Sequence, residues 1–278
     1  MPVVPASHVR ALDAFEDGVV NGFGCPRENR ISPEGDGIGR SSEVVRPTTR
    51  RKGYGMKIVI AGGHGKIALR LTRRLTERGD TVVGIVRNPR HVDDIRRAGG
   101  DAVVLDLERA TVEEVAATLA GADAAVFSAG SGNSATAERR DRMDRAAVVL
   151  VMDAAEKAGV RRFLHVSSIN VGCADDRGIG EGYSVYLRAK RAAEQHIFTR
   201  DTLDWTVLRP GVLTDGRGDG TVELTAGKEV GPKTARFDQV AREDVAAVLV
   251  ALLDRPDTAR RIYVVVGGKT PIEQAVDA

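Results

Sequence analysis

The sequence has few cysteines, few aromatic residues and almost no net charge, and each of these shortages narrows what the protein can be. Cys25 and Cys173 are the two cysteines, and they lie far apart with no C-x-x-C spacing. This argues against a disulfide framework or a zinc site and favours a reducing, cytoplasmic location. The net charge of +2 indicates neither nucleic acid nor a membrane surface as a partner. No apolar run approaches the roughly 20 residues of a membrane span, and residues 1–30 lack the continuous apolar core of a secretory signal.

Residues 1–55 differ in composition from the rest of the chain. They hold five of the ten prolines and show no sustained periodicity, so we expect a disordered N-terminal extension. Met56 stands directly before the first strand pattern, and an alternative is that translation begins there. Residues 56–278 are expected to form one globular domain, since the chain is 42% hydrophobic and 29% charged.

Strand and helix patterns alternate from Met56 onward, which is typical of a parallel α/β sheet. The helix predicted over 111–119 has a capping box, in which Thr111 is the cap and Glu114 follows three residues later. The predicted fold class is therefore α/β, with a doubly wound parallel sheet. Strands are expected at 57–61, 81–86, 102–105, 122–127, 162–166, 205–208 and 262–266, and helices at 89–98, 111–119, 137–158, 183–198, 242–253 and 271–276.

A glycine-rich turn separates the first predicted strand from an amphipathic helix pattern. Gly62, Gly65 and Ala68 fit the spacing G-x-x-G-x-x-[GA], and Gly63, Gly65 and Ala68 fit G-x-G-x-x-[GA]. Glycines allow the backbone to approach a pyrophosphate, and a helix N-terminus offers unpaired N–H groups and a positive dipole end. Because the strand and the helix that this motif requires flank it, the turn predicts a dinucleotide site.

The end of the second predicted strand indicates which dinucleotide is bound. In NAD-preferring forms of such a sheet an acidic residue there binds the ribose 2′-hydroxyl, whereas this chain has Arg87, followed by Arg90. A guanidinium pairs well with a 2′-phosphate, so we expect NADP(H) rather than NAD(H), the alternative for Arg87 being a solvated surface charge. The residues expected to contact the cofactor around the turn are Gly62, Gly63, His64, Gly65, Lys66 and Ile67, although a solvated histidine and a surface lysine are the alternatives for His64 and Lys66.

Tyr186 and Lys190 form a Y-x-x-x-K pair in the helix predicted over 183–198. Residues four apart lie on the same helix face, so the phenol and the ammonium can point at one spot. A nearby cation would lower the tyrosine pKa toward neutrality and make it a proton donor. The lysine could also hold the ribose hydroxyls of the nicotinamide, and a serine after the fifth strand could bind a substrate carbonyl.

Two charged or ionisable features are expected to be structural. His165 lies at the end of the fifth predicted strand. A basic run in the helix predicted over 137–158 is expected to form a solvated face. It consists of Arg139, Arg140, Arg142 and Arg145, with Asp141 and Asp144 between them.

Three segments together resemble the atypical short-chain dehydrogenase/reductase group of small NAD(P)H-binding proteins, which includes NmrA-like and flavin-reductase-like members. They are His165–Val171 (HVSSINV), Tyr186–Lys190 (YLRAK) and Thr206–Gly211 (TVLRPG). The resemblance covers residues 56 to about 275. It implies a Rossmann fold for residues 56–278, with a small substrate-side portion at the C-terminus.

The resemblance also implies roles for individual residues. Ser168 matches the serine of the family's catalytic triad, with Ser167 as the alternative, and Tyr186 and Lys190 match its tyrosine and lysine. Two departures stand out, because Ala61 replaces the usual Thr before the turn and Val171-Gly172-Cys173 replaces the V-Y-G of sugar epimerases. The implied cofactor contacts are Asp106 and Leu107 at the adenine, Ala129 and Gly130 at the adenosine ribose, and Lys190 and Pro210 on the nicotinamide side.

The function that these patterns favour is an NADP-dependent oxidoreductase that transfers hydride to a small carbonyl, quinone or flavin-like acceptor. One alternative is an NADP(H)-binding redox sensor of the NmrA type that does not catalyse a reaction. Another is a nucleotide-sugar epimerase or dehydratase, which the short segment after Gly211 disfavours. The expected partners are a small-molecule substrate and a second copy of the chain, since the helices after the fourth and fifth strands often form dimer faces in related folds.

Overall fold

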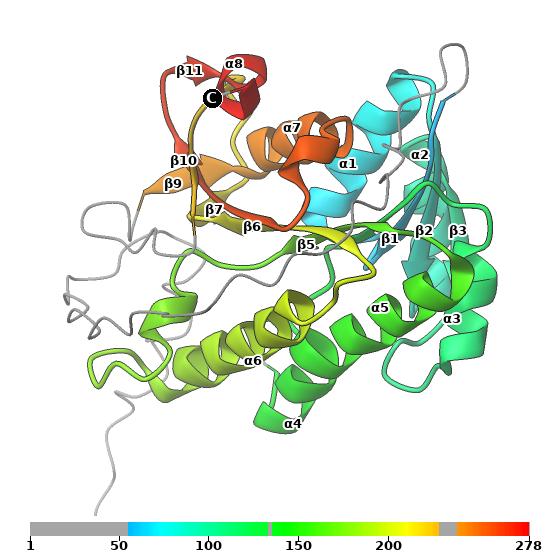
Figure 1. The fold of residues 1–278 in the computed structure, drawn as a ribbon, viewed down its shortest axis with the longest axis horizontal. Coiled ribbons are helices and arrows are strands. Elements are labelled where there is room, and N and C mark those ends of the chain that lie inside the picture. Colours follow the sequence, from blue (N-terminus) through cyan, green and yellow to red (C-terminus); the bar gives the residue numbers. More distant parts are fainter. Residues whose placement is uncertain (1–54, 133–134, 228–237, 278) are drawn as a thin grey trace, which may run out of the picture.

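The computed structural model describes residues 55–132, 135–227 and 238–277. The predicted N-terminal extension, apart from Gly55, lies outside these residues. The described chain forms a nine-stranded sheet in the order β11-β8-β10-β6-β5-β4-β1-β2-β3, with helices on both faces (Figure 1). This arrangement confirms the predicted α/β fold class. The strand order reverses between β1 and β4, and in open α/β sheets ligands bind at the carboxyl ends of the strands at such a point.

Parallel strands make up most of the sheet. They are β1 (Lys57–Ala61), β2 (Thr81–Val86), β3 (Asp101–Val104), β4 (Ala124–Phe127), β5 (Arg162–Val166), β6 (Asp204–Pro210) and β10 (Arg261–Gly267). Two further strands, β8 (Thr221–Ala226) and β11 (Thr270–Pro271), complete one edge, where β8 runs antiparallel to both β10 and β11. A separate two-stranded sheet joins β7 (Val212–Thr214) to β9 (Gln239–Ala241).

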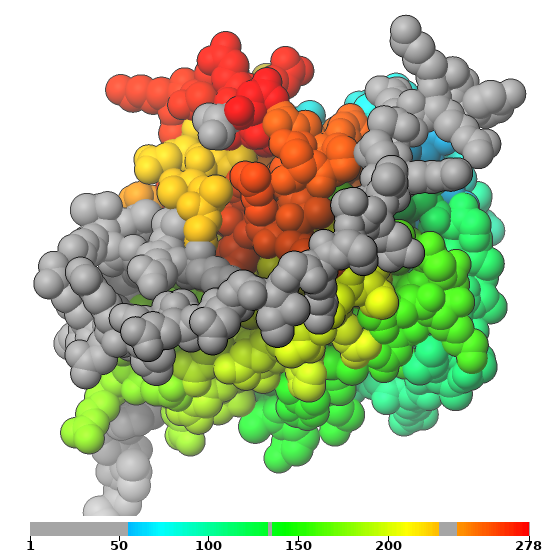
Figure 2. All heavy atoms as spheres, in the orientation of Figure 1, coloured from blue at the N-terminus to red at the C-terminus, as the bar shows by residue number. Residues whose placement is uncertain are grey.

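Two apolar clusters hold the helices against the sheet. Side chains from one sheet face pack with α1 (Lys66–Glu77), α7 (Arg242–Leu253) and α8 (Ile272–Asp277). Side chains from the other face pack with α3 (Val112–Leu119), α5 (Ala147–Ala158) and α6 (Glu181–Phe198). The remaining helices are α2 (Val92–Arg97), next to α1, and the short α4 (Ala137–Arg140). In the space-filling view the orange and red C-terminal segments gather on the side opposite the green helices (Figure 2).

The predicted helices and strands are present, most of them with bounds shifted by one or two residues. The capping box is confirmed, because the Thr111 hydroxyl accepts a bond from the Glu114 N–H and the Glu114 carboxylate accepts one from the Thr111 N–H. Gly159 ends α5 in the left-handed conformation, at φ 73°. None of the helices in the described ranges is long and apolar enough to cross a membrane.

Two expectations about the elements are wrong, and four strands have no counterpart among the predicted elements. The sixth strand does not end at Leu208 but continues to Pro210, because β10 pairs alongside it to that residue. The helix expected over 137–158 contains a π-helical segment, Asp141–Ala146, between α4 and α5. The sequence patterns also did not indicate β7, β8, β9 or β11. Of these, β8 makes the C-terminal edge of the main sheet antiparallel through its pairing with β10 and β11.

Candidate functional site

The glycine-rich turn lies at the carboxyl end of β1, where the strand order reverses. The Gly62 and Gly63 N–H groups both donate to the carbonyl of Ile85 at the end of β2, at 3.2 and 3.0 Å. Gly62 has φ +82°, and a Cβ there would lie 2.5 Å from the Cα of Ala129. A Cβ on Gly63 would lie 2.6 Å from the Cα of Gly84. The turn is therefore pressed between β2 and the segment after β4, and only glycine fits at its first two positions.

A cavity of about 550 Å³ opens beside this turn. Its walls come from the turn itself and from the carboxyl ends of β2, β3 and β4, which are the positions that a dinucleotide's adenosine half occupies in such folds. Met143, His91 and Asn88 also line it, and the sequence analysis did not single them out. The predicted cofactor residues that the structure brings together here are Gly62, His64, Gly65, Arg87, Asp106, Leu107, Ala129 and Gly130.

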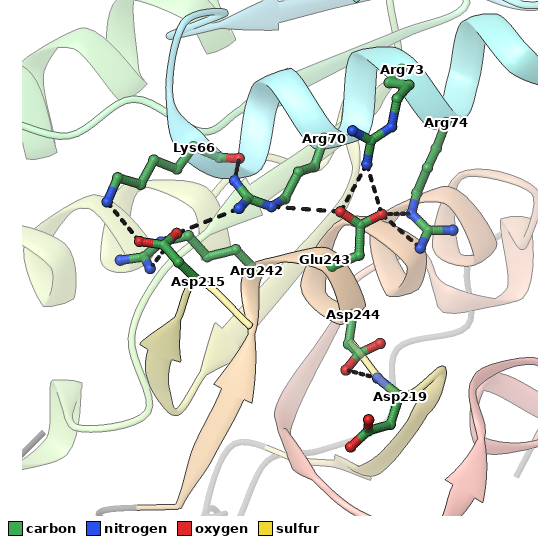
Figure 3. A network of polar contacts seen from close by, with 9 residues as sticks. All are labelled: Lys66, Arg70, Arg73, Arg74, Asp215, Asp219, Arg242, Glu243 and Asp244. Carbon is green, nitrogen blue, oxygen red and sulfur yellow. Dashed lines mark hydrogen bonds and ion pairs between the residues drawn. The ribbon is translucent and has the colours of Figure 1, made fainter. Parts of the chain in front are cut away.

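Five other predicted cofactor residues do not line this cavity, and one of them, Lys190, lies on α6 and is described below. Gly63 packs on Gly84, and Ile67 is buried in the core beneath α1. Pro210 lies in β6, where its carbonyl accepts a 3.0 Å bond from the Ile169 N–H. Lys66 points away to Asp215, at 2.7 Å (Figure 3).

The Lys66–Asp215 pair belongs to a network that joins α1 to the C-terminal portion. Arg242 also contacts Asp215, at 3.0 Å, and Glu243 at the start of α7 lies between Arg73 and Arg74, at 2.9 and 2.8 Å (Figure 3). These contacts fix the loop after β7 and the beginning of α7 to the helix that follows the glycine-rich turn.

His64, inside the turn, is held by α2. Its Nε2 lies 2.6 Å from Oδ2 of Asp94, and its ring stacks on that of His91 with 3.6 Å between the centroids. The hydrogen bond from His64 lowers the pKa of the Asp94 carboxyl. These contacts therefore fix the His64 side chain, and with it the turn, against the start of α2.

Arg87 points at a carboxylate that the sequence analysis did not identify. Its Nη1 lies 3.0 Å from Oε1 of Glu108, in the loop after β3. Arg139 and Arg142, from the helix after β4, contact the same carboxylate at 3.2 and 3.1 Å. Burial alone would raise the Glu108 pKa, but the bonds from Arg142 and Arg139 outweigh it and hold that pKa below its ordinary value.

The basic run of this helix is only in part the solvated face that we expected, since Asp141 and Arg142 are exposed. Arg140 and Asp144 are both buried, and the Arg140 guanidinium lies 5.5 Å from the centre of the Tyr186 ring. Asp144 and Arg140 precede the buried Val148 by four and eight residues, which places them on the inward face of the helix. This four-residue spacing in the sequence could have indicated that Arg140 and Asp144 face inward.

Tyr186 and Lys190 share one face of α6, as predicted. Lys190 is only 3% exposed, and its Nζ donates to the carbonyl of Val166 at 3.1 Å. The same Nζ lies 3.5 Å from Oδ1 of Asp144, in the π-helical segment, and 5.9 Å from the centre of the Tyr186 ring. The other Asp144 oxygen accepts a 3.3 Å bond from the Ser131 N–H. π-helical segments often occur at functional sites.

The tyrosine pKa moves in the direction opposite to the one expected from the Y-x-x-x-K pair. Burial raises the pKa of Tyr186, and the negative charge of Asp144 raises it further. The physical reason is that burial disfavours the charged phenolate, and the carboxylate of Asp144 disfavours it further. The Tyr186 hydroxyl therefore remains protonated at neutral pH.

Buried hydroxyls occur close to the contacts of Lys190, in the segments that follow β4 and β5. Ser167 continues the strand pairing through its N–H, which donates to the Leu208 carbonyl at 2.7 Å. Its hydroxyl and that of Ser131 are buried and have no hydrogen-bond partner among the described residues. Ser168, the predicted serine, is half-buried next to it. Hydroxyls of this kind are available to a ligand that brings its own donors and acceptors.

His165 is fully buried, and both of its ring nitrogens lack partners in the described part of the chain. Burial lowers its pKa well below the usual 6.5, and the charge of Lys190 lowers it further. The imidazole is therefore neutral in the folded protein over the physiological range.

This neutral histidine makes the stability of the fold depend on pH. Below pH 6.5 the unfolded chain binds a proton at His165 that the folded chain does not, so the free energy of unfolding falls by up to about 1.4 kcal/mol per pH unit between pH 6.5 and 5. We expect His165→Phe to reduce that slope in urea unfolding measured across this range. The control His196→Gln, on an exposed histidine of α6, should leave it unchanged, and an unaltered slope in His165→Phe would contradict the assignment.

Comparison with known proteins gives matches along most of the chain. A family model described as NAD(P)H-binding matches residues 62–256. The uncharacterized sugar epimerase YhfK of Bacillus subtilis is 32% identical over 80% of this chain and 99% of its own. A solved structure of a candidate NAD-dependent epimerase/dehydratase from Bacillus halodurans has a TM-score of 0.72 and 32% identity, over 80% of this chain and 99% of that one. The oxidoreductase ylbE from Lactococcus lactis has a TM-score of 0.67 and 28% identity, over 80% of this chain and 95% of its own.

Proposed function

Because this chain belongs to the NAD(P)H-binding family of Rossmann proteins that resemble atypical short-chain dehydrogenases/reductases, we propose that it is an NADP(H)-dependent oxidoreductase. Its acceptor would be a small quinone, flavin-like or carbonyl compound. The observation that carries this proposal is the cavity of about 550 Å³ at the switch point of the sheet, with the glycine-rich turn on one side and Arg87 on the other.

The residues around the cavity fit a dinucleotide. Gly62 packs against Ala129 and has no side chain, so a ligand can approach the backbone of the turn closely. Gly65 precedes the first turn of α1, whose N–H groups suit a pyrophosphate. Asp106, Leu107 and the Ala129–Gly130 segment would hold the adenosine. Lys190, with the unpartnered Ser131 and Ser167 hydroxyls nearby in the fold, would hold the nicotinamide ribose. The expectation of NADP(H) over NAD(H) rests on Arg87, and Arg139, which also lines the adenosine side, supports it.

The nicotinamide supplies the hydride when it is bound, and the protein's own groups bind and orient the acceptor. Tyr186 would donate a hydrogen bond through its protonated hydroxyl, and Ser168 or Ser167 would orient an acceptor oxygen. Because the raised Tyr186 pKa makes a phenolate unfavourable, this site suits acceptors that need little help with proton transfer. Reduced flavins and quinones take their protons readily from water, so they are favoured over simple carbonyls.

Binding and turnover test the proposal together. We expect calorimetric titration of the full chain to give tighter binding of NADPH than of NADH, by about tenfold or more. NADPH oxidation, followed by its absorbance, should be stimulated by a flavin or a quinone. Tyr186→Phe should reduce that turnover by less than about threefold, because the phenol would act only as a hydrogen-bond donor.

The other outcomes separate the alternatives. NADPH binding without turnover on flavins, quinones and carbonyls would favour the redox-sensor function instead. The names of the relatives from Bacillus subtilis and Bacillus halodurans favour an epimerase as the second candidate. Interconversion of nucleotide sugars with no net change in NAD(H) would support that candidate against our proposal.

A further inference from the structure

Glu108 holds three arginines at the edge of the cavity, and they come from two separate parts of the fold. Arg87 follows β2, whereas Arg139 and Arg142 lie in the helical run after β4. All three contact the Glu108 carboxylate, at 3.0 to 3.2 Å. Glu108 itself is only 11% exposed, and its N–H donates to Asp106 Oδ1 at 3.1 Å, which fixes the loop.

The charges in this cluster do not balance. Three guanidinium groups face one carboxylate, and each contacts it through a single nitrogen. A guanidinium has five N–H donors in a planar fork, which suits paired bonds to phosphate oxygens. The cluster therefore has both positive charge and donor capacity beyond what Glu108 uses.

The position of the cluster indicates what could use that capacity. Arg87 and Arg139 line the cavity together with Asp106 and Leu107, the residues expected at the adenosine. Resting on the proposed function, we infer that Glu108 is a built-in counter-ion of a phosphate-monoester subsite. On this inference Glu108 competes with the 2′-phosphate of the cofactor for Arg87 and Arg139, the two arginines of the cluster that line the cavity. It thereby sets the preference between NADPH and NADH.

A carboxylate in this position would act in a defined direction. It holds the arginines in place while the site is empty, but it must give up part of its contacts when a phosphate arrives. Removing its charge while keeping its shape should therefore strengthen binding of a 2′-phosphate and leave a ligand with a free 2′-hydroxyl unaffected. The opposite role, in which Glu108 accepts a bond from the 2′-hydroxyl as acidic residues do in NAD-preferring proteins, predicts the reverse selectivity.

Two fragments of the cofactor test this on the full chain by calorimetry. Adenosine 2′,5′-bisphosphate carries the 2′-phosphate, and ADP has the free 2′-hydroxyl. We expect Glu108→Gln to bind the bisphosphate about tenfold more tightly than the unmodified chain and to bind ADP within twofold. Arg87→Ala should weaken the bisphosphate by about tenfold and leave ADP nearly unchanged.

Two further variants guard the interpretation. Glu113→Gln makes the same chemical change on α3, where Glu113 pairs with Lys157, and it should alter neither affinity. Glu108→Asp keeps the charge but shortens the side chain, so it should raise the affinity for the bisphosphate by less than Glu108→Gln does. It serves as the test if Glu108→Gln fails to fold. Thermal unfolding of each variant checks its integrity.

The remaining outcomes overturn the inference. Weaker ADP binding in Glu108→Gln, with the bisphosphate unchanged, would assign Glu108 to the ribose hydroxyl. If Glu108→Gln and the unmodified chain bind the bisphosphate equally well and also bind ADP equally well, Glu108 has only a structural role. If neither fragment nor NADPH binds the unmodified chain, the proposed function fails as well, and that result is distinguishable because it appears before any substitution is made.

Discussion

Gly62→Ala is expected to weaken NADPH binding by about 100-fold while the rest of the chain remains folded. The added Cβ would lie 2.5 Å from the Cα of Ala129, in a backbone conformation with φ +82° that side chains disfavour. Strain of this kind costs about 1–3 kcal/mol, and overpacking costs a similar amount. The turn can relax in the free protein, but it must re-form to bind the cofactor, so the cost falls on affinity. A combined cost of about 2.7 kcal/mol corresponds to a 100-fold increase in Kd.

A matched control separates strain from steric exclusion. Gly121 also has a positive φ, of +70°, but a Cβ there would meet nothing within 4 Å. Gly121→Ala should therefore lower the free energy of unfolding by about 1 kcal/mol and leave NADPH affinity unchanged. Equal NADPH affinity in Gly62→Ala and the unmodified chain, measured by calorimetry, would mean that the turn does not contact the cofactor.

Arg162→Ala is expected to lower the free energy of unfolding by about 3–5 kcal/mol. Arg162 starts β5 and is 3% exposed, and its guanidinium donates to four oxygens from two segments. Nη1 reaches the Asp204 carbonyl and the Thr206 hydroxyl, at 2.9 and 2.7 Å. Nη2 reaches the Leu252 carbonyl and the Thr258 hydroxyl, at 2.6 and 2.8 Å. Removing it leaves three buried acceptors and one part-buried acceptor short of a donor and opens a cavity where α7 ends.

The neighbouring residue provides the control. Arg161 forms an exposed ion pair with Asp204, so Arg161→Ala should cost less than about 1 kcal/mol. Both costs are measured by urea unfolding. Burial lowers the pKa of Arg162 to about 10, so the side chain remains charged at neutral pH. A loss under 1.5 kcal/mol in Arg162→Ala would mean that the energy of desolvating this charge offsets its hydrogen bonds.

The adenosine side of the site could be predicted from the sequence because its signals are local. The glycine spacing at residues 62–65 and the arginine after the second strand each depend on a few neighbouring residues. The structure brings Gly62, Gly65 and Arg87 to one cavity with Asp106 and Ala129, as the strand order of a doubly wound sheet requires. Long apolar periodicity likewise made α1, α5 and α6 predictable.

The parts that could not be predicted depend on contacts between distant segments. Glu108 contacts Arg139 and Arg142, more than 30 positions away along the chain, and no motif links them. Asp144 meets Lys190 only because a π-helical segment and α6 pack together. Strands β7, β9 and β11 have two or three residues each, which is too short for an alternating pattern to appear.

The π-helical segment has a consequence for how sequences of this family are compared. A π turn accommodates about one residue more than the α turn that it replaces, so a relative with a regular helix here would have one residue fewer between Thr136 and Gly159. An alignment would record that difference as a one-residue gap within 141–146. Such a gap would identify the relatives in which this turn is α-helical and in which the residue at the position of Asp144 is therefore presented differently to Lys190.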